Sequence, residues 1–337
     1  MKAYIIRRLL LMIPTILGIT ILLFTLIQFL PGGPVEQYIA KIQQSLSAQG
    51  LDVNTAITEA EMENIRAYYG YDRPAYERYF LWLGNVLQLD LGESFSYHEP
   101  VWDVIKQRMP ISLFFGLTSF LIAYAVCIPL GFKKALEHQS GFDIGSSAII
   151  FAGYVIPGYV LGLLLIVFFA GGSYLDLFPV SGVVSDDWEF MGPVDQVLDF
   201  LHHMALPMVC YMVGEFAFLT LLMKNSLLDE IGKDYLRTAV VKGAPFRVAV
   251  WKHALRNALI PIATRLSEIF TLIFAGALLI EKVFNIDGMG LLVYTSILDR
   301  DYNVVMGIIL MVGVLTMLGR LFSDILYVVI DPRIRFD

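Results

Sequence analysis

Residues 234–261 read DYLRTAVVKGAPFRVAVWKHALRNALIP and lie between two long apolar segments, at 204–223 and 258–280. Two helical patterns cover this stretch, and they break at Gly243 and Pro245, residues that favour turns. A connection that only returned the chain to a bilayer would be short, so this one predicts a docking surface. The basic residues of the connection are Lys224, Lys233, Arg237, Lys242, Arg247, Lys252 and Arg256.

One helical face of this stretch is predicted to dock. Leu236, Ala239, Val240 and Gly243 fall on the same side of a helix, and small residues there let another surface approach closely. Gly243 also permits a backbone turn that a side chain would hinder. The plainer interpretation is an ordinary cytoplasmic loop, because membrane orientation alone explains positive charge.

The composition is that of a membrane protein. Hydrophobic residues make up 57% of the 337, and the mean hydropathy is +0.67. A soluble domain of this size would be less apolar. Each of six apolar segments is long enough to cross a hydrocarbon layer of about 30 Å as a helix. The segments are 9–30, 110–132, 146–170, 204–223, 258–280 and 303–330. The predicted fold is therefore an all-α membrane protein with six transmembrane helices.

The Lys and Arg residues predict the orientation. Segments 1–8, 131–145, 224–257 and 331–337 carry 3, 2, 7 and 2 of them, whereas 171–203 carries none and 281–303 carries two. Short loops rich in Lys and Arg stay in the cytoplasm. We therefore expect both termini and the 224–257 loop to be cytoplasmic.

The segment 31–108 is predicted to form an outer helical module. Thr58 and Glu61 make a capping box at the start of one helix. Asp72 and Pro74 open a second helix, and a third opens at Pro100.

The order and spacing of many short motifs resemble one known family, the permeases of binding-protein-dependent peptide ABC importers. The resemblance covers nearly the whole chain and is strongest to the YejB type. The motifs are MKAYIIRRLLLMIPTILGIT at 1–20, PGGP at 31–34, YGYDRPAYERYF at 69–80, LDLGESF at 89–95, VIPGYVLGLLLIVFF at 155–169, LFPVSG at 177–182, RTAVVKG at 237–243, RDYNVVMG at 300–307 and DPRI at 331–334.

The resemblance implies a type I ABC importer permease fold with a cytosolic coupling helix. Residues 1–30 would form a cytosolic stub and the first span, 31–109 a periplasmic helical module, and 110–337 a five-span core with the coupling loop 224–257. The residues that would couple to the ATPase are Asp234, Arg237, Thr238, Ala239, Lys242, Gly243 and Ala244.

The same resemblance implies the function and the partners. The chain would be one permease subunit of an importer that moves peptides or peptide-like compounds across the bacterial inner membrane. Its partners would be a second homologous permease, two ATPase subunits and a periplasmic binding protein. ATP and magnesium would bind to the ATPase subunits, so this chain would hold no cofactor itself.

Charged residues inside predicted spans are costly and face protein or water. Arg265 and Glu268 are three apart on the fifth segment, and Arg320 and Asp324 are four apart on the sixth. These residues are predicted to form ion pairs, either within their own helix or with a neighbouring helix. Glu215 has no local partner near the middle of the fourth segment. It either pairs with a neighbouring helix or lines the translocation path, for which Glu215, Arg265 and Glu268 are the candidates.

The outer segments are acidic. Segment 171–203 carries six Asp and Glu and no Lys or Arg. The positive-inside bias explains missing basic residues but not abundant acidic ones. Asp186, Asp187 and Glu189 are candidates for docking basic patches on a binding protein, or for attracting cationic peptides.

Several motifs are absent from the sequence. It holds no G-x-x-x-x-G-K-S/T phosphate loop, no G-x-S-x-G and no H-E-x-x-H, so we expect neither ATP hydrolysis by this chain nor any catalytic or metal site. The basic residues are accounted for by orientation, so no nucleic-acid binding is expected. The alternative function is a secondary transporter or channel without an ATPase. A helix interrupted at the bilayer midplane would favour it, and Pro157-Gly158 is the candidate break.

Overall fold

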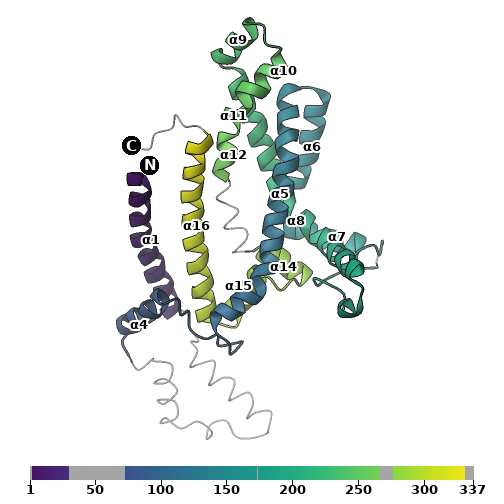
Figure 1. Cartoon of the computed structure of the whole chain (residues 1–337). Coiled ribbons are helices and arrows are strands. Elements are labelled where there is room, and N and C mark those ends of the chain that lie inside the picture. The colour runs from purple at the N-terminus through teal and green to yellow at the C-terminus, as the bar shows by residue number, and fades with distance from the viewer. Residues whose placement is uncertain (1, 30–72, 173, 266–275, 331–337) are drawn as a thin grey trace, which may run out of the picture. The chain divides into compact units, whose positions relative to one another are not determined.

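A computed structural model describes residues 2–29, 73–172, 174–265 and 276–330. Within these ranges the regular elements are helices, and the one β-type pairing is an isolated bridge between Glu93 and Pro100. This confirms the predicted all-helical class. The long helices are α1 (Lys2–Phe29), α5 (Val101–Leu136), α8 (Pro193–Ile231) and α16 (Tyr302–Ile330), as Figure 1 shows.

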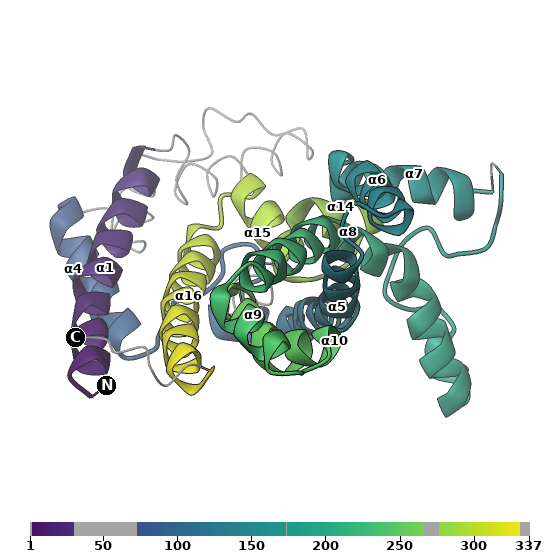
Figure 2. The same ribbon diagram turned by 90° about the horizontal axis from the view of Figure 1, so that it is seen from above.

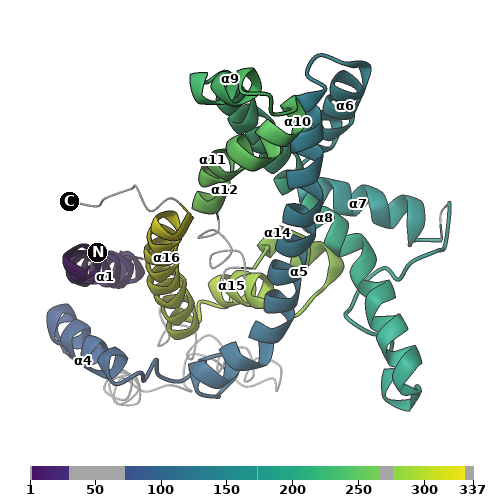
Figure 3. The same ribbon diagram turned by 45° about the horizontal axis from the view of Figure 1, so that its top comes forward.

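These four helices are long and apolar enough to cross a membrane. A fifth crossing depends on α6 (Gly141–Val155) and α7 (Gly158–Phe169), which meet at 94° and form either a broken span or a re-entrant loop. Figures 2 and 3 show α7 turning away from α6 at this break. The kink predicted at Pro157 is thus confirmed, and it is a sharp bend. The remaining predicted span, 258–280, lies in part outside the described residues.

The shorter helices lie in the connections between the long helices. They are α4 (Ala75–Leu87), α9 (Asp234–Val241), α10 (Phe246–Ala249), α11 (Leu255–Ala258), α12 (Ile260–Thr264), α14 (Leu278–Phe284) and α15 (Met289–Leu298), with a 3-10 turn at Trp188–Phe190 and a π-helical turn at Val250–Ala254.

Two of the helices predicted for the outer module are described. The helix predicted after Pro74 is α4. The helix predicted after Pro100 does begin at Val101, but it does not end before the apolar segment. It continues through Pro110 into the span as α5, since membrane helices tolerate proline where neighbours satisfy the freed backbone groups. The capping box at Thr58 lies outside the described residues.

The described chain forms two compact units, which are taken separately. The first comprises residues 1–8, 108–291 and 315–337, and the second comprises 9–107 and 292–314. In the first unit α5 and α8 approach closely, because a Cβ at Gly131 would lie 2.7 Å from the Cβ of Met223. Buried Leu219, Met223 and Leu227 of α8 share one core cluster with the connection between α8 and α12.

Gly158 and Gly162 also serve packing within the first unit. A Cβ at Gly158 would lie 2.9 Å from the carbonyl oxygen of Cys210, and one at Gly162 would lie 2.9 Å from the ring of Phe284. The two glycines therefore let α7 contact α8 and α14 at close range.

The second unit joins two motifs that lie far apart in the sequence, LDLGESF and RDYNVVMG. The carboxylate of buried Asp301 accepts hydrogen bonds from the Ser94 hydroxyl and from the backbone N–H of Ser96 (3.0 Å). Asn303 Nδ2 donates to the carbonyl oxygen of Glu93 at 2.8 Å. These bonds hold the start of α16 against the turn that precedes α5.

Candidate functional site

The stretch after α8 forms a compact helix–turn–helix. Gly243 has a φ of +94°, a region that favours glycine. Its N–H bonds to the carbonyl of Val240 (2.9 Å), and the Ala244 N–H bonds to that of Ala239 (3.2 Å). These two bonds are the Schellman arrangement that ends a helix, and Pro245 then caps α10. The predicted turn at Gly243 and Pro245 is confirmed.

The face predicted to dock is divided between the interior and the surface. Leu236 is buried, and Ala239 packs against the same core cluster as Val250 and Ala254. The small residue Ala239 therefore lets α9 approach the body of its own chain. Val240 is 38% exposed and open space surrounds Gly243, so docking by this part of the face stays a prediction.

The outward side carries charge and exposed apolar groups together. Asp234 and Arg237 form an exposed ion pair at 3.7 Å, and Thr238 and Lys242 are exposed beside them. Large apolar side chains are exposed as well, among them that of Val241, which is 87% exposed. We call the four most exposed of this stretch the exposed apolar set: Val241, Phe246, Val248 and Trp251. Sequence reasoning missed them, because apolar residues carry no signal in so apolar a chain.

A polar cluster fixes this helix–turn–helix to the end of α8. Glu230 is buried and accepts hydrogen bonds from Lys233 Nζ and the Tyr235 hydroxyl, each at 2.5 Å, and from Asn257 Nδ2 at 3.3 Å. Burial, followed by the bond to Glu230, raises the pKa of Tyr235 to about 12, so this phenol remains a donor. The cluster therefore fixes α9 and α11 to the end of α8.

The acidic loop, residues 186–189, lies just before the N-terminal end of α8. Asp186, Asp187 and Glu189 are exposed around the 3-10 turn. The loop is folded back on α8, because Trp188 Nε1 donates to the carbonyl of Gln196 at 3.0 Å. Asp199 does not belong to the exposed acids, since its carboxylate accepts bonds from the Ser185 N–H and hydroxyl at 2.9 and 2.6 Å.

No metal site is formed near this loop by the residues that the structure describes. His202 Nε2 lies 2.6 Å from the carbonyl oxygen of Leu177, and His203 Nδ1 lies 2.9 Å from that of Asp199. Across the described ranges, no three potential metal ligands come together.

Glu215 and Arg265 form an ion pair between α8 and the end of α12, at 3.6 Å. The Glu215 side chain is 46% exposed and that of Arg265 is 27% exposed, although Glu215 lies near the middle of α8. Arg265 also lies over the ring of Phe218, 4.2 Å from its centroid. The structure thus brings two of the three candidates together, and the third, Glu268, lies outside the described residues.

Of the two kinds of ion pair predicted for Asp324, the structure shows the one with a neighbouring helix. Asp324 lies 3.1 Å from Arg8 Nη2 and accepts a hydrogen bond from the Tyr4 hydroxyl at 2.9 Å. These contacts join α16 to the start of α1. The side chains of Arg8 and Tyr4 on α1 both reach the carboxylate of Asp324.

A fully buried carboxylate organises the end of the first unit around α14. Glu281 accepts hydrogen bonds from Ser112 of α5 (3.2 Å) and Tyr211 of α8 (2.9 Å). The backbone N–H groups of Ala277 (3.2 Å) and Leu291 (2.8 Å) also donate to it. Sequence reasoning missed this centre, because its donors come from three distant segments.

A second buried ionic centre joins α5, α6 and α8. The carboxylate of Asp143 lies 3.1 Å from Lys134 Nζ and 2.7 Å from Lys224 Nζ. Fully buried Lys134 also donates to the hydroxyls of Ser146 and Ser147. These lysines were interpreted from the sequence only as orientation signals, but they also hold three helices together.

The comparisons with known proteins agree with this architecture. Residues 127–336 match the family described as the inner membrane component of binding-protein-dependent transport systems. The chain is 40% identical to the inner membrane ABC transporter permease protein YejB of Escherichia coli O157:H7, over all of both chains. It is 38% identical to the peptidoglycan transport system permease protein YejB of Agrobacterium fabrum, over all of this chain and 99% of that one. It is 35% identical to the oligopeptide transport system permease protein AppB of Bacillus subtilis, over all of both chains.

The chain therefore belongs to the family of binding-protein-dependent transport permeases, and the resemblance inferred from its motifs is confirmed. It is a multi-pass membrane protein of the ABC permease class. The family is a transport component rather than an enzyme family.

Proposed function

We propose that this chain is one permease subunit of an ATP-driven importer that moves peptides or peptide-like compounds from the periplasm to the cytoplasm. The main support is the placement of two surfaces on one helix. The helix–turn–helix with the exposed apolar set follows the end of α8, and the acidic loop precedes its start. At 1.5 Å per residue, the 39 residues of α8 span about 58 Å, well beyond a hydrocarbon layer of about 30 Å.

The substrate class rests on the relatives. Two of them are named for transport of oligopeptides and of peptidoglycan, and both align along essentially the whole chain. Peptides and peptide-containing wall fragments share an amide backbone with charged groups. We assign that chemistry to the substrate of this chain.

The proposed assembly has two ATPase subunits, a second homologous permease and a periplasmic binding protein. The sequence lacks a phosphate-binding loop, so ATP and magnesium belong to the ATPase subunits. The helix–turn–helix after α8 serves as the coupling helix, with Asp234, Arg237, Thr238, Lys242 and the exposed apolar set against an ATPase. Ala239 and Ala244 are only partly buried, and they support the turn from within.

We assign both termini and the 224–257 loop to the cytoplasm, and 31–109 and 171–203 to the periplasm of a bacterial inner membrane. The Lys and Arg distribution supports this orientation. The sixth crossing of the type I fold is assigned to 258–280, where α12 begins a helix.

The second candidate function is transport without an ATPase, and the bend between α6 and α7 is the feature that favours it. Affinity purification from native membranes separates the two candidates. An ATPase subunit that co-purifies with the chain supports the proposed function. A chain that transports in its absence belongs to the alternative.

Gly243→Ala is expected to weaken retention of the ATPase about tenfold. A side chain at positive φ costs about 1–2 kcal/mol, and about 1.4 kcal/mol is a factor of ten. Open space surrounds the position, so the effect arises from the backbone rather than from a clash. The matched control is Gly232→Ala at the other end of α9, where φ is −71°. Equal retention by both variants in a pull-down assay would contradict the role of the turn.

Neutralising Asp186, Asp187 and Glu189 together is expected to slow association of the binding protein about tenfold at low salt. The difference should vanish as salt shortens the screening length, which is about 10 Å at 0.1 M. Stopped-flow association across a salt series measures it. Asp229→Asn, an exposed carboxylate at the opposite end of α8, is the control. An unchanged rate at low salt rejects docking, whereas a changed preference for cationic peptides alone supports substrate attraction.

We assign the Glu215–Arg265 pair to the translocation path, because both side chains are partly exposed in the middle of a span. Glu215→Gln and Arg265→Gln are each expected to reduce uptake severalfold. The double variant distinguishes a role in helix packing from a role in lining the translocation path. If the pair only stabilises helix packing, the double variant recovers uptake of all peptides alike. If the pair lines the path, uptake of neutral peptides recovers while the ratio of cationic to anionic peptide uptake changes.

A further inference from the structure

The second unit contains a corner where α4 crosses the last turns of α1 (Figure 1). The hydroxyls of Thr20 and Tyr79 are 3.0 Å apart, and the rings of Phe24 and Tyr79 meet edge to face at 5.4 Å. Arg78 donates to Gln28 Oε1 at 2.6 Å. Because α1 is apolar along Tyr4–Gln28, these contacts place α4 at the depth where this span ends.

The α4 helix has an exposed apolar face. Tyr76, Phe80 and Leu87 lie at spacings of four and seven residues, and they are 64%, 66% and 78% exposed. Asn85 lies on the opposite side of the helix, next to Leu81, which is 51% exposed. No residue of α4 is buried. The apolar face is therefore uncovered by the part of the chain that the structure describes.

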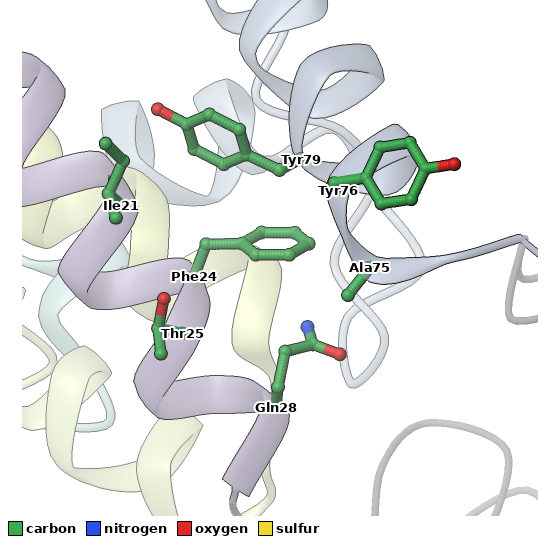
Figure 4. A pocket seen from close by; sticks show the side chains of 7 residues that line it. All are labelled: Ile21, Phe24, Thr25, Gln28, Ala75, Tyr76 and Tyr79. Atoms are coloured by element: carbon green, nitrogen blue, oxygen red, sulfur yellow. The ribbon is translucent and has the colours of Figure 1, made fainter.

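An apolar groove lies between the two helices. Its volume is about 350 Å³. Figure 4 shows the rings of Phe24, Tyr76 and Tyr79 around it, with Gln28 toward the end of α1. The complete lining is Ile21, Phe24, Thr25, Gln28, Ala75, Tyr76 and Tyr79.

We propose that an acyl chain of a membrane phospholipid occupies this groove and that α4 lies along the membrane–water boundary. The groove is continuous with the surface of α1, which is long and apolar enough to cross a membrane and whose apolar window is only 6% buried within this chain. Exposed aromatic rings beside an apolar helix are typical of the interface, where amphipathic helices insert about 5–10 Å. A water-soluble partner would leave the α1 side of the groove facing lipid.

The position of α4 is tested with nitroxide labels on the full chain, in its assembled transporter in phospholipid nanodiscs. Both native cysteines are buried, so cysteines introduced at Phe80 and Asn85 take the label. We expect the label at 80 to collide more with oxygen than with a water-soluble nickel chelate, and the label at 85, on the opposite side of α4, to show the opposite order. Two labels that are equally accessible to the chelate would overturn the proposal. Two labels shielded from both reagents would do so as well, because a protein partner would then cover α4.

The groove itself is tested by filling it. Ala75→Trp places a ring among the lining residues, and Glu77→Trp, on the opposite side of the same helix turn, is the matched control. Native mass spectrometry of the purified transporter counts the retained phospholipids. We expect Ala75→Trp to retain about one fewer phospholipid per chain than the control. Equal retention by the two variants contradicts an acyl chain in the groove, whether or not peptide transport is ATP-driven.

Discussion

Val241→Asp is expected to abolish ATP-driven uptake while leaving the chain folded and inserted. The side chain of Val241 is 87% exposed, so a carboxylate there is solvated in the free chain. In the assembled transporter the same carboxylate would be buried against the ATPase. Burying an unpaired carboxylate in such a contact costs about 2 kcal/mol or more, which is a loss of affinity of about 30-fold.

Val241→Ala is the matched control, because it shortens the side chain without adding charge, and we expect it to keep most of the uptake. Co-purified ATPase and peptide uptake are measured for both variants. If the aspartate variant retains the ATPase at the wild-type level, Val241 lies outside the contact and the proposed docking side is wrong.

Glu281→Leu is expected to give the largest loss of stability in the chain. The substitution removes the acceptor of the Ser112 and Tyr211 hydroxyls and one acceptor of the Ala277 and Leu291 N–H groups. Breaking such a buried charged centre costs about 3–5 kcal/mol. The apparent unfolding midpoint of the purified protein should then fall by about 10 °C.

Glu281→Gln should have an intermediate effect, since it keeps one acceptor oxygen but turns an NH₂ group toward donors. Lys282→Ala is the control, because the neighbouring Lys282 is exposed on the same helix. A midpoint for Glu281→Leu equal to that of the control would show that the centre contributes little to the folded state.

The local features of the coupling segment could be predicted from sequence because short-range chemistry determines them. Gly243 and Pro245 end one helix and start the next, Pro74 starts α4, and Pro157 breaks the third apolar segment. Each effect acts through φ or a missing N–H within a few residues. The direction that α9 faces could not be predicted in this way, since Leu236 and Ala239 pack against residues of α8 and the π-helical turn.

The buried charges could not be predicted for a related reason. Lys134 and Lys224 carry the same orientation signal as any cytoplasmic lysine, and only the packing of α5, α6 and α8 brings both to Asp143. Glu215 was recognised as a residue needing a partner. Arg265 was expected to pair within its own helix or with a neighbouring one. A sequence displays only local spacing, so Glu215 could not be named as its partner.

The most direct test of the account is peptide uptake by the purified transporter in proteoliposomes, with ATP supplied on one side at a time. A cysteine at Val241 reports which side carries the coupling segment through its labelling by a membrane-impermeant reagent. We expect uptake to need ATP on the side where residue 241 is labelled, with the binding protein and peptide on the other side. Uptake that proceeds without ATP, or that needs ATP on the side of the acidic loop, would contradict it.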